Sequence, residues 1–115
     1  MDTDFDLQIK PFFWIDREQG SSLALAAGRY KQELFDSQAE EGFEGNGYDW
    51  ASLAAVFLAE RMPILEDTIE FDPEAGTFVA YSTNSEALRR FAINFKEACE
   101  DDVLIADLFS RTVLD

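Results

Sequence analysis

Histidine is absent from this sequence of 115 residues, and cysteine occurs only once, as Cys99. The absence of histidine excludes triads and general bases built on imidazole, as well as imidazole ligands for a metal. A single cysteine cannot form an intramolecular disulfide or supply a cluster of zinc-binding thiolates. Cys99 falls on the apolar face of a predicted helix, so we expect a buried structural thiol and no metal site.

Long hydrophobic runs are also absent, because none approaches the roughly 18 residues that a membrane-spanning helix needs. The first residues are acidic and do not combine a basic segment with an apolar stretch, so we expect no signal peptide. No glycine-rich dinucleotide motif or Walker motif occurs, and we expect no cofactor. These absences together predict a cytoplasmic protein that does not enter a membrane.

Positive charge is scarce, since nine lysine and arginine residues face 24 acidic ones and the formal net charge is −15. Such a chain repels phosphate backbones and anionic membrane surfaces, so nucleic acid and membrane binding are not expected. The acidic excess is larger than solubility usually requires. A basic protein partner would explain it, because an acidic surface accelerates association with a basic one.

Carboxylates are the remaining candidates for catalysis, and adjacent pairs occur at residues 40–41 and 101–102. Neighbouring residues do not face one another on a helix, so neither pair is placed to act across a cleft. We therefore interpret these acids as a solvated surface and expect a protein that is not an enzyme.

The first predicted hairpin joins residues 8–15 and 22–27 through a turn that contains Gly20. Pro11 suggests that the first of these strands lies at a sheet edge or carries a bulge. Phe12, Phe13 and Trp14 are consecutive, and alternate strand residues face opposite sides. At least one of these rings is therefore expected to be exposed as an interface anchor or covered by another element.

The second predicted hairpin joins residues 68–72 and 77–82 through a turn in which Gly76 can supply a positive φ. Residues 30–35 are ambiguous between a strand and a helical turn, and residues 36–49 predict a long exposed loop.

Helical spacing of apolar residues predicts a helix over residues 49–61, with Asp49 as N-cap and Pro63 as terminator. A second helix is predicted to run to residue 100 from a cap at Asn84 or Ser85, and a short third one to begin at residues 101–102. The order is β-β-α-β-β-α-α, which predicts one α+β domain over residues 1–115. Its four-stranded antiparallel sheet carries two to three helices on one face.

Several short motifs resemble bacterial immunity-protein family fifty-one. They are residues 41–54 (EGFEGNGYDWASLA), 71–76 (FDPEAG) and 80–82 (AYS), followed by Phe91-Ala92 and Phe95 in the closing helix. The similarity extends over nearly the whole chain and is best over residues 41–99.

The resemblance implies a partner in a polymorphic toxin system. Proteins of this kind bind and neutralise the C-terminal domain of a cognate toxin in the producing cell, and they are typically not enzymes. The toxin's reaction does not follow from the family, and the oligomeric state of this chain is left open.

The predicted contact surface is acidic, because toxins that attack nucleic acids tend to have basic clefts. Its candidates are Glu40, Glu41, Glu44 and Asp49 on a glycine-bearing loop, Tyr48 as a hot spot, and Asp101 and Asp102 as a second patch. A competing interpretation makes Gly45, Asn46, Gly47 and Asp49 structural, as a turn that starts the first long helix.

The sequence is also compatible with two other function classes. One is an acidic adaptor or regulatory subunit that binds a basic cytoplasmic protein without inhibiting it. The other is a small hydrolase that uses a carboxylate pair, which would need two carboxyls with perturbed pKa values in one pocket.

Overall fold

The computed structural model describes residues 3–112 of the chain. Its elements, in chain order, are α1 (Thr3–Ile9), β1 (Phe13–Asp16), β2 (Ser21–Ala26), α2 (Gln32–Asp36), the 3-10 turn η1 (Ala39–Glu41), α3 (Gly47–Arg61), the 3-10 turn η2 (Pro63–Leu65), β3 (Glu70–Phe71), β4 (Thr77–Ser82), α4 (Ser85–Glu100) and α5 (Asp102–Ser110). None of the helices in this part of the chain is both long and apolar enough to cross a membrane.

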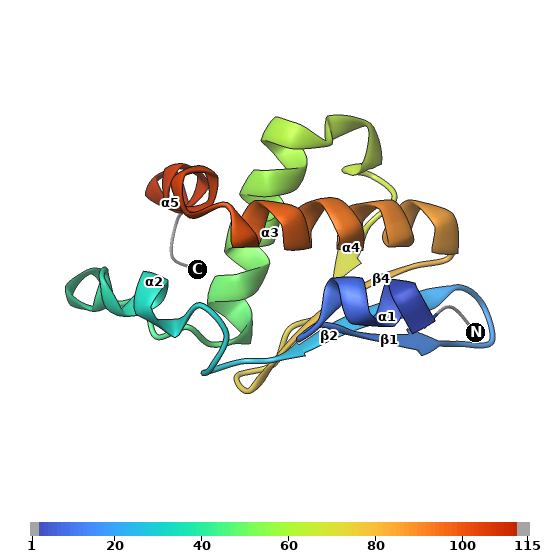
Figure 1. Ribbon diagram of the computed structural model, residues 1–115, viewed down its shortest axis with the longest axis horizontal. Helices are drawn as coiled ribbons and strands as arrows, with labels where there is room; N and C mark the ends of the chain where they lie inside the picture. The colour runs from blue at the N-terminus through green and yellow to red at the C-terminus, as the bar shows by residue number, and fades with distance from the viewer. Residues whose placement is uncertain (1–2, 113–115) are drawn as a thin grey trace.

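The four strands form one antiparallel sheet in the order β1-β2-β4-β3. Each predicted hairpin is present, and the two hairpins join through β2 and β4, which lie in the middle of the sheet. The helices lie on one side of the sheet (Figure 1). The predicted α+β class, with a four-stranded antiparallel sheet and helices on one face, is confirmed.

The prediction of a strand over residues 8–15 is wrong in its first half. Phe5 and Ile9 are four residues apart and both are buried, which is the spacing of a helix face, and the chain forms α1 there. A cis peptide bond between Lys10 and Pro11 follows, and β1 starts only at Phe13. The predicted element order therefore lacks α1, and it also lacks α2 from the ambiguous segment.

Trp50 lies at the centre of the core and is completely buried. Five aromatic rings have their centroids within 6.5 Å of it, and they come from five separate parts of the chain. They are Phe12 at 6.0 Å, Tyr30 at 5.9 Å, Phe35 at 5.2 Å, Phe78 at 6.5 Å and Phe95 at 6.1 Å. Aromatic burial of this kind is a large part of the driving force for folding.

Asn46, not Asp49, is the N-cap of α3, because its side-chain oxygen accepts a hydrogen bond of 2.8 Å from the Asp49 backbone N–H. The predicted start is thus late by three residues. The expected cap at Asn84 is present, and its side chain accepts a hydrogen bond from the backbone N–H three residues on. Asp101, predicted only to lie at the start of the last helix, caps α5 in the same way. The predicted end before Pro63 is confirmed.

The Asp49 carboxylate binds the backbone of the loop that precedes α3. Its Oδ2 atom accepts hydrogen bonds from the backbone N–H groups of Glu44, at 2.7 Å, and Gly45, at 2.9 Å. The side chain is almost completely buried. Asp49 therefore fastens the preceding loop to the first turn of α3.

Gly47 fixes where α3 starts relative to the sheet. A Cβ atom at this position would lie 1.9 Å from the carbonyl oxygen of Glu74 and 2.2 Å from that of Thr77, so only glycine fits. The Gly47 N–H also donates to the Ala75 carbonyl at 3.1 Å. Gly76, in the same turn, lacks the positive φ that the sequence suggested, and a Cβ there would meet open space.

Replacing Gly47 by alanine is expected to lower the free energy of unfolding by about 2 kcal/mol or more, because the methyl group would collide with backbone atoms that cannot move independently. Gly76→Ala is the matched control, and it is expected to stay within about 1 kcal/mol of the wild type. Urea denaturation followed by tryptophan fluorescence measures both. Equal stability of the two variants would contradict the packing described for Gly47.

Asp49→Ala is expected to lower the free energy of unfolding by about 2 to 3 kcal/mol, because two backbone N–H groups lose their acceptor. Glu40→Ala removes an exposed acid from the same segment and is expected to change stability by no more than about 0.5 kcal/mol. The same urea titration compares the two. A loss of stability at Glu40 as large as that at Asp49 would show that charge, not hydrogen bonding, is responsible.

Candidate functional site

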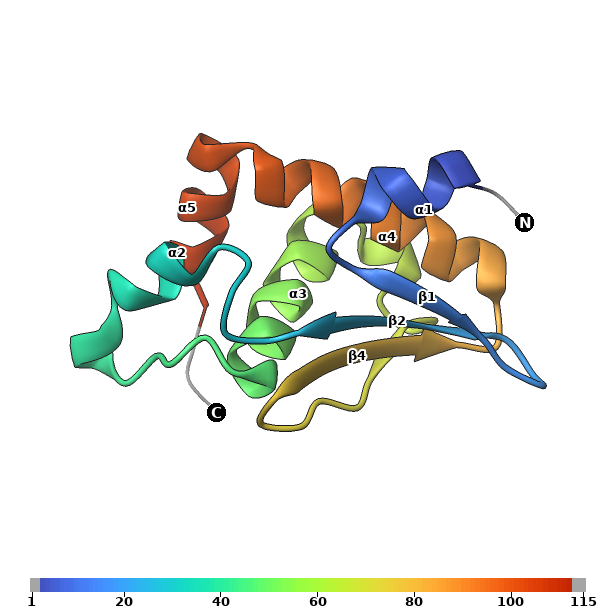
Figure 2. The same cartoon turned by 60° about the horizontal axis from the view of Figure 1, so that its bottom comes forward.

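Residues 32–46, here called the acidic arm, extend from one end of the body and comprise α2, η1 and the loop that leads into α3 (Figures 1 and 2). The arm carries acids and no lysine or arginine. Its five acidic side chains are all exposed: Glu33, Asp36, Glu40, Glu41 and Glu44. The arm therefore presents a surface of a single charge sign.

Two buried phenylalanines hold the arm against the rest of the protein. Phe35 contacts Trp50 and also Phe109 of α5, with ring centroids 5.2 Å apart in both pairs. Phe43 contacts Phe109 at 4.8 Å. The two sides of the arm are joined by Gln32, whose Nε2 donates to the Glu44 carbonyl oxygen at 2.9 Å. Within the loop predicted over residues 36–49, the acids other than Asp49 are exposed, but Phe43 and Asp49 are buried, and short helical turns replace part of the irregular loop.

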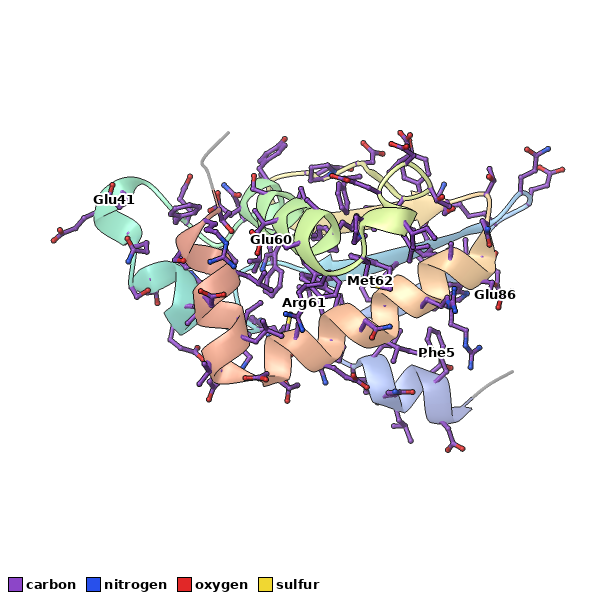
Figure 3. The ribbon with its side chains drawn as sticks, turned by 90° about the horizontal axis from the view of Figure 1, so that it is seen from above. Phe5, Glu41, Glu60, Arg61, Met62 and Glu86 are labelled. Atoms are coloured by element: carbon purple, nitrogen blue, oxygen red, sulfur yellow. The ribbon has the colours of Figure 1, made fainter. Side chains whose placement is uncertain are left out.

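A hollow of about 650 Å³ lies between the arm and α5. Leu34 and Phe43 line it from the arm, and Ala106 and Phe109 line it from α5. Glu41 is also a lining residue, and Figure 3 shows it at the outer end of the arm. The acidic surface thus borders a partly apolar depression.

The structure brings Glu40, Glu41 and Glu44 together on the arm, where all three are exposed. Tyr48 is close by in the first turn of α3, and its side chain is 45% exposed. Asp49 is the exception. Its carboxylate is buried and accepts hydrogen bonds from the arm's backbone, which agrees with the structural interpretation of this residue.

Asp101 and Asp102 lie at the junction of α4 and α5, apart from the end of the arm. The Asp101 carboxylate caps α5 through the Leu104 N–H. Asp102 forms an ion pair of 3.2 Å with Lys31, which immediately precedes α2. Since the Asp102 side chain is largely exposed, this pair adds little stability. The second acidic patch therefore borders the root of the arm.

The three consecutive aromatic residues take three different positions. Phe12 is buried in the core, and Trp14 faces the helices, where Phe5 of α1 covers it with a ring-centroid distance of 5.2 Å. Phe13 points to the other side of the sheet and stays 49% exposed. Both of the outcomes expected for these rings thus occur, cover for Trp14 and exposure for Phe13.

The groups in residues 3–112 whose pKa values shift clearly are Tyr30, Glu60, Cys99, Asp107 and Arg111. Burial raises the pKa of the Cys99 thiol, which therefore stays protonated and unreactive. The pKa values of Glu60 and Asp107 are lowered by hydrogen bonds from Arg111. A general acid needs the opposite shift, so this carboxylate pair does not favour the hydrolase alternative. No group of three or more His, Cys, Asp or Glu residues that could hold a metal occurs in the same range.

Comparison with known proteins gives one match. Residues 12–114 match the family model described as Immunity protein 51. Neither the curated proteins nor the solved structures contain a match. The matched region includes the arm, α3, the second hairpin and α4, which contain the motifs on which the resemblance was based. Because it covers nearly the whole chain, the protein belongs to the Immunity protein 51 family, which implies an antitoxin role exercised by binding a cognate toxin protein.

Proposed function

We propose that this protein neutralises its cognate bacterial toxin domain, in the cytoplasm of the producing cell, by placing the acidic arm in a basic active-site cleft of the toxin. The observation that carries the proposal is the composition and position of the arm. Five exposed acids and no base occupy a segment that extends beyond the body of the protein.

The fastening of the arm supports this role. Phe35, Phe43 and Asp49 fix the arm's backbone before any partner is present. A segment that is already ordered loses less conformational entropy on binding than a flexible loop does. The arm can therefore present its carboxylates to a cleft at a small entropic cost.

Charge supports the same conclusion. An enzyme that cleaves nucleic acid concentrates lysine and arginine where the phosphates bind. Carboxylates can take the place of phosphates in such a cleft, and the net charge of −15 attracts a basic toxin over a distance. We place Tyr48 at the edge of this contact as an aromatic anchor, and Asp101 and Asp102 at its periphery.

Co-expression is the direct test of neutralisation. The toxin domain encoded beside this gene is expressed in a bacterial host with and without the present chain, at matched levels. Growth is expected only when both are present. Growth arrest despite equal expression of the two proteins would overturn the proposal.

The arm's contribution to the association rate with the toxin domain is tested with Glu41→Lys combined with Glu44→Lys. The association rate with an active-site variant of the toxin domain is expected to fall by about tenfold or more at low salt, because electrostatic steering is lost. Between about 50 and 500 mM salt, the wild-type rate is expected to fall more steeply than the variant rate. Stopped-flow fluorescence measures both.

The matched control is Glu66→Lys combined with Asp67→Lys, which makes the same change in net charge at exposed positions after η2. This control is expected to reduce the association rate by a much smaller factor. If the two charge reversals slow association equally, the overall charge steers the complex and the arm has no special role.

A further inference from the structure

The face of the sheet turned away from the helices has an unusual composition. The helices that pack against the sheet, α1, α3 and α4, lie on the other side, and Figure 2 shows the strands uncovered where this face comes forward. We call it the outer sheet face and define it by the residues Phe13, Ile15, Ser22, Ala24, Val79 and Tyr81.

Strand register places these residues on one side. Ile15 pairs with Ser22 and Ser22 with Tyr81, so the three side chains form one row across the sheet. Phe13, Ala24 and Val79 form the next row on the same side, two residues along each strand. The residues between the rows point into the core.

The two rows leave large apolar side chains in contact with solvent. Phe13 is 49% exposed, Ile15 41% and Tyr81 38%. On the central strand, Ser22 and Ala24 are small and nearly inaccessible. The Arg17 Nε–H donates to the Ser22 hydroxyl oxygen, so one basic side chain lies over Ser22 beside the apolar residues. An uncovered sheet face normally carries polar residues. Large apolar side chains gathered on one exposed face indicate a binding surface.

The border of this face is acidic along β3. Glu70 pairs with Tyr81 and lies on the same side, and the Asp72 N–H donates to the Val79 carbonyl at 2.9 Å. Glu70, Asp72 and the following Glu74 are all exposed. An apolar centre with a charged border is the usual anatomy of a protein interface. This border matches a partner whose apolar patch is bordered by lysine or arginine.

A second copy of the chain fits this face poorly. Each copy carries a net charge of −15, and stacking two of them would bring like charges together. The acidic border repels nucleic acid and anionic membranes for the same reason. A basic protein satisfies both the apolar centre and the charged border.

We infer that the outer sheet face anchors the toxin domain by apolar contact, while the acidic arm steers it. This inference rests on the proposed function. A standard interface covers roughly 800 Å² of each partner, a patch on the order of 30 Å across. The longest dimension of the chain is 41 Å, and the sheet and the arm follow one another along it. One toxin domain can therefore contact both surfaces.

The two surfaces have different kinetic roles. Desolvated aromatic side chains near the centre of an interface act mainly on the dissociation rate. Charges at its border act mainly on the association rate and on its salt dependence. The two contributions can therefore be measured separately.

The test is Phe13→Thr combined with Tyr81→Thr, since threonine keeps the β-propensity of both positions. Dissociation from the inactivated toxin domain is expected to accelerate by about 30-fold or more, the size of a hot-spot effect. The salt dependence of association is expected to stay as in the wild type. The matched control, Ile64→Thr with Val103→Thr, removes the same kind of exposed apolar surface elsewhere, where exposure is 87% and 82%. It is expected to leave dissociation unchanged.

Hydroxyl-radical footprinting of the wild-type complex gives a second readout that needs no variant. Phe13 and Tyr81 are expected to become protected from oxidation when the toxin domain binds, and Ile64 is not. Unchanged oxidation of both rings, or unchanged dissociation of a folded double variant, would overturn the inference.

Other results separate the inference from the proposed function. A wild-type chain that neither binds nor protects against the toxin would defeat the proposed function itself. Normal protection with an insensitive sheet face defeats only the inference. A wild-type dimer that dissociates on the Phe13 and Tyr81 substitutions would assign the face to self-association and would also overturn it.

Discussion

The packing of aromatic rings around Trp50 is the constraint on which the rest of the structure depends. Its neighbours come from the segment before β1, the segment before α2, α2 itself, β4 and α4. One buried side chain thus sets the position of α3, the sheet, the longest helix and the root of the arm together. A chain with a net charge of −15 repels itself, and burial of large apolar surface is what opposes that repulsion.

The acidic arm shows how charge and apolar contact are combined. The rest of the protein is itself acidic, so it offers the arm's acids little electrostatic attraction. Contact with the body comes instead from Phe35 and Phe43, which reach Trp50 and Phe109, and from backbone hydrogen bonds to Asp49. The arm is therefore attached by groups that point inward, while the charge that a partner would meet points outward.

Much of the fold could be predicted from the sequence because local pattern and tertiary structure agree over most of its length. The strand over Thr77–Ser82 and the helix over Ser85–Glu100 have the predicted bounds. Agreement fails where distant contacts decide the structure. The first predicted strand starts too early because its aromatic run favours a strand, whereas the residues just before that run form α1, which buries Phe5 and Ile9. The short helices of the arm depend on Phe109, more than 60 residues further along the chain.

The candidate site was harder to predict than the fold. The exposure of Glu40, Glu41 and Glu44 follows from their polarity, and the sequence indicates it correctly. The burial of Asp49 could not be predicted in the same way, because charged residues are rarely buried unless specific partners are present. The exposure of the outer sheet face could not be predicted from the sequence, for a geometric reason. Alternation separates Phe13 from Trp14, but it does not tell which side the helices cover.

The way the arm is attached also determines how it can evolve. Its hold on the body uses Phe35, Phe43 and Asp49, whereas Glu33, Glu40 and Glu41 project from it into solvent. Substitutions at the projecting positions therefore leave the inward contacts intact. The exposed charges can therefore change during evolution while the fold stays the same. Related proteins with this fold can then come to bind different partners.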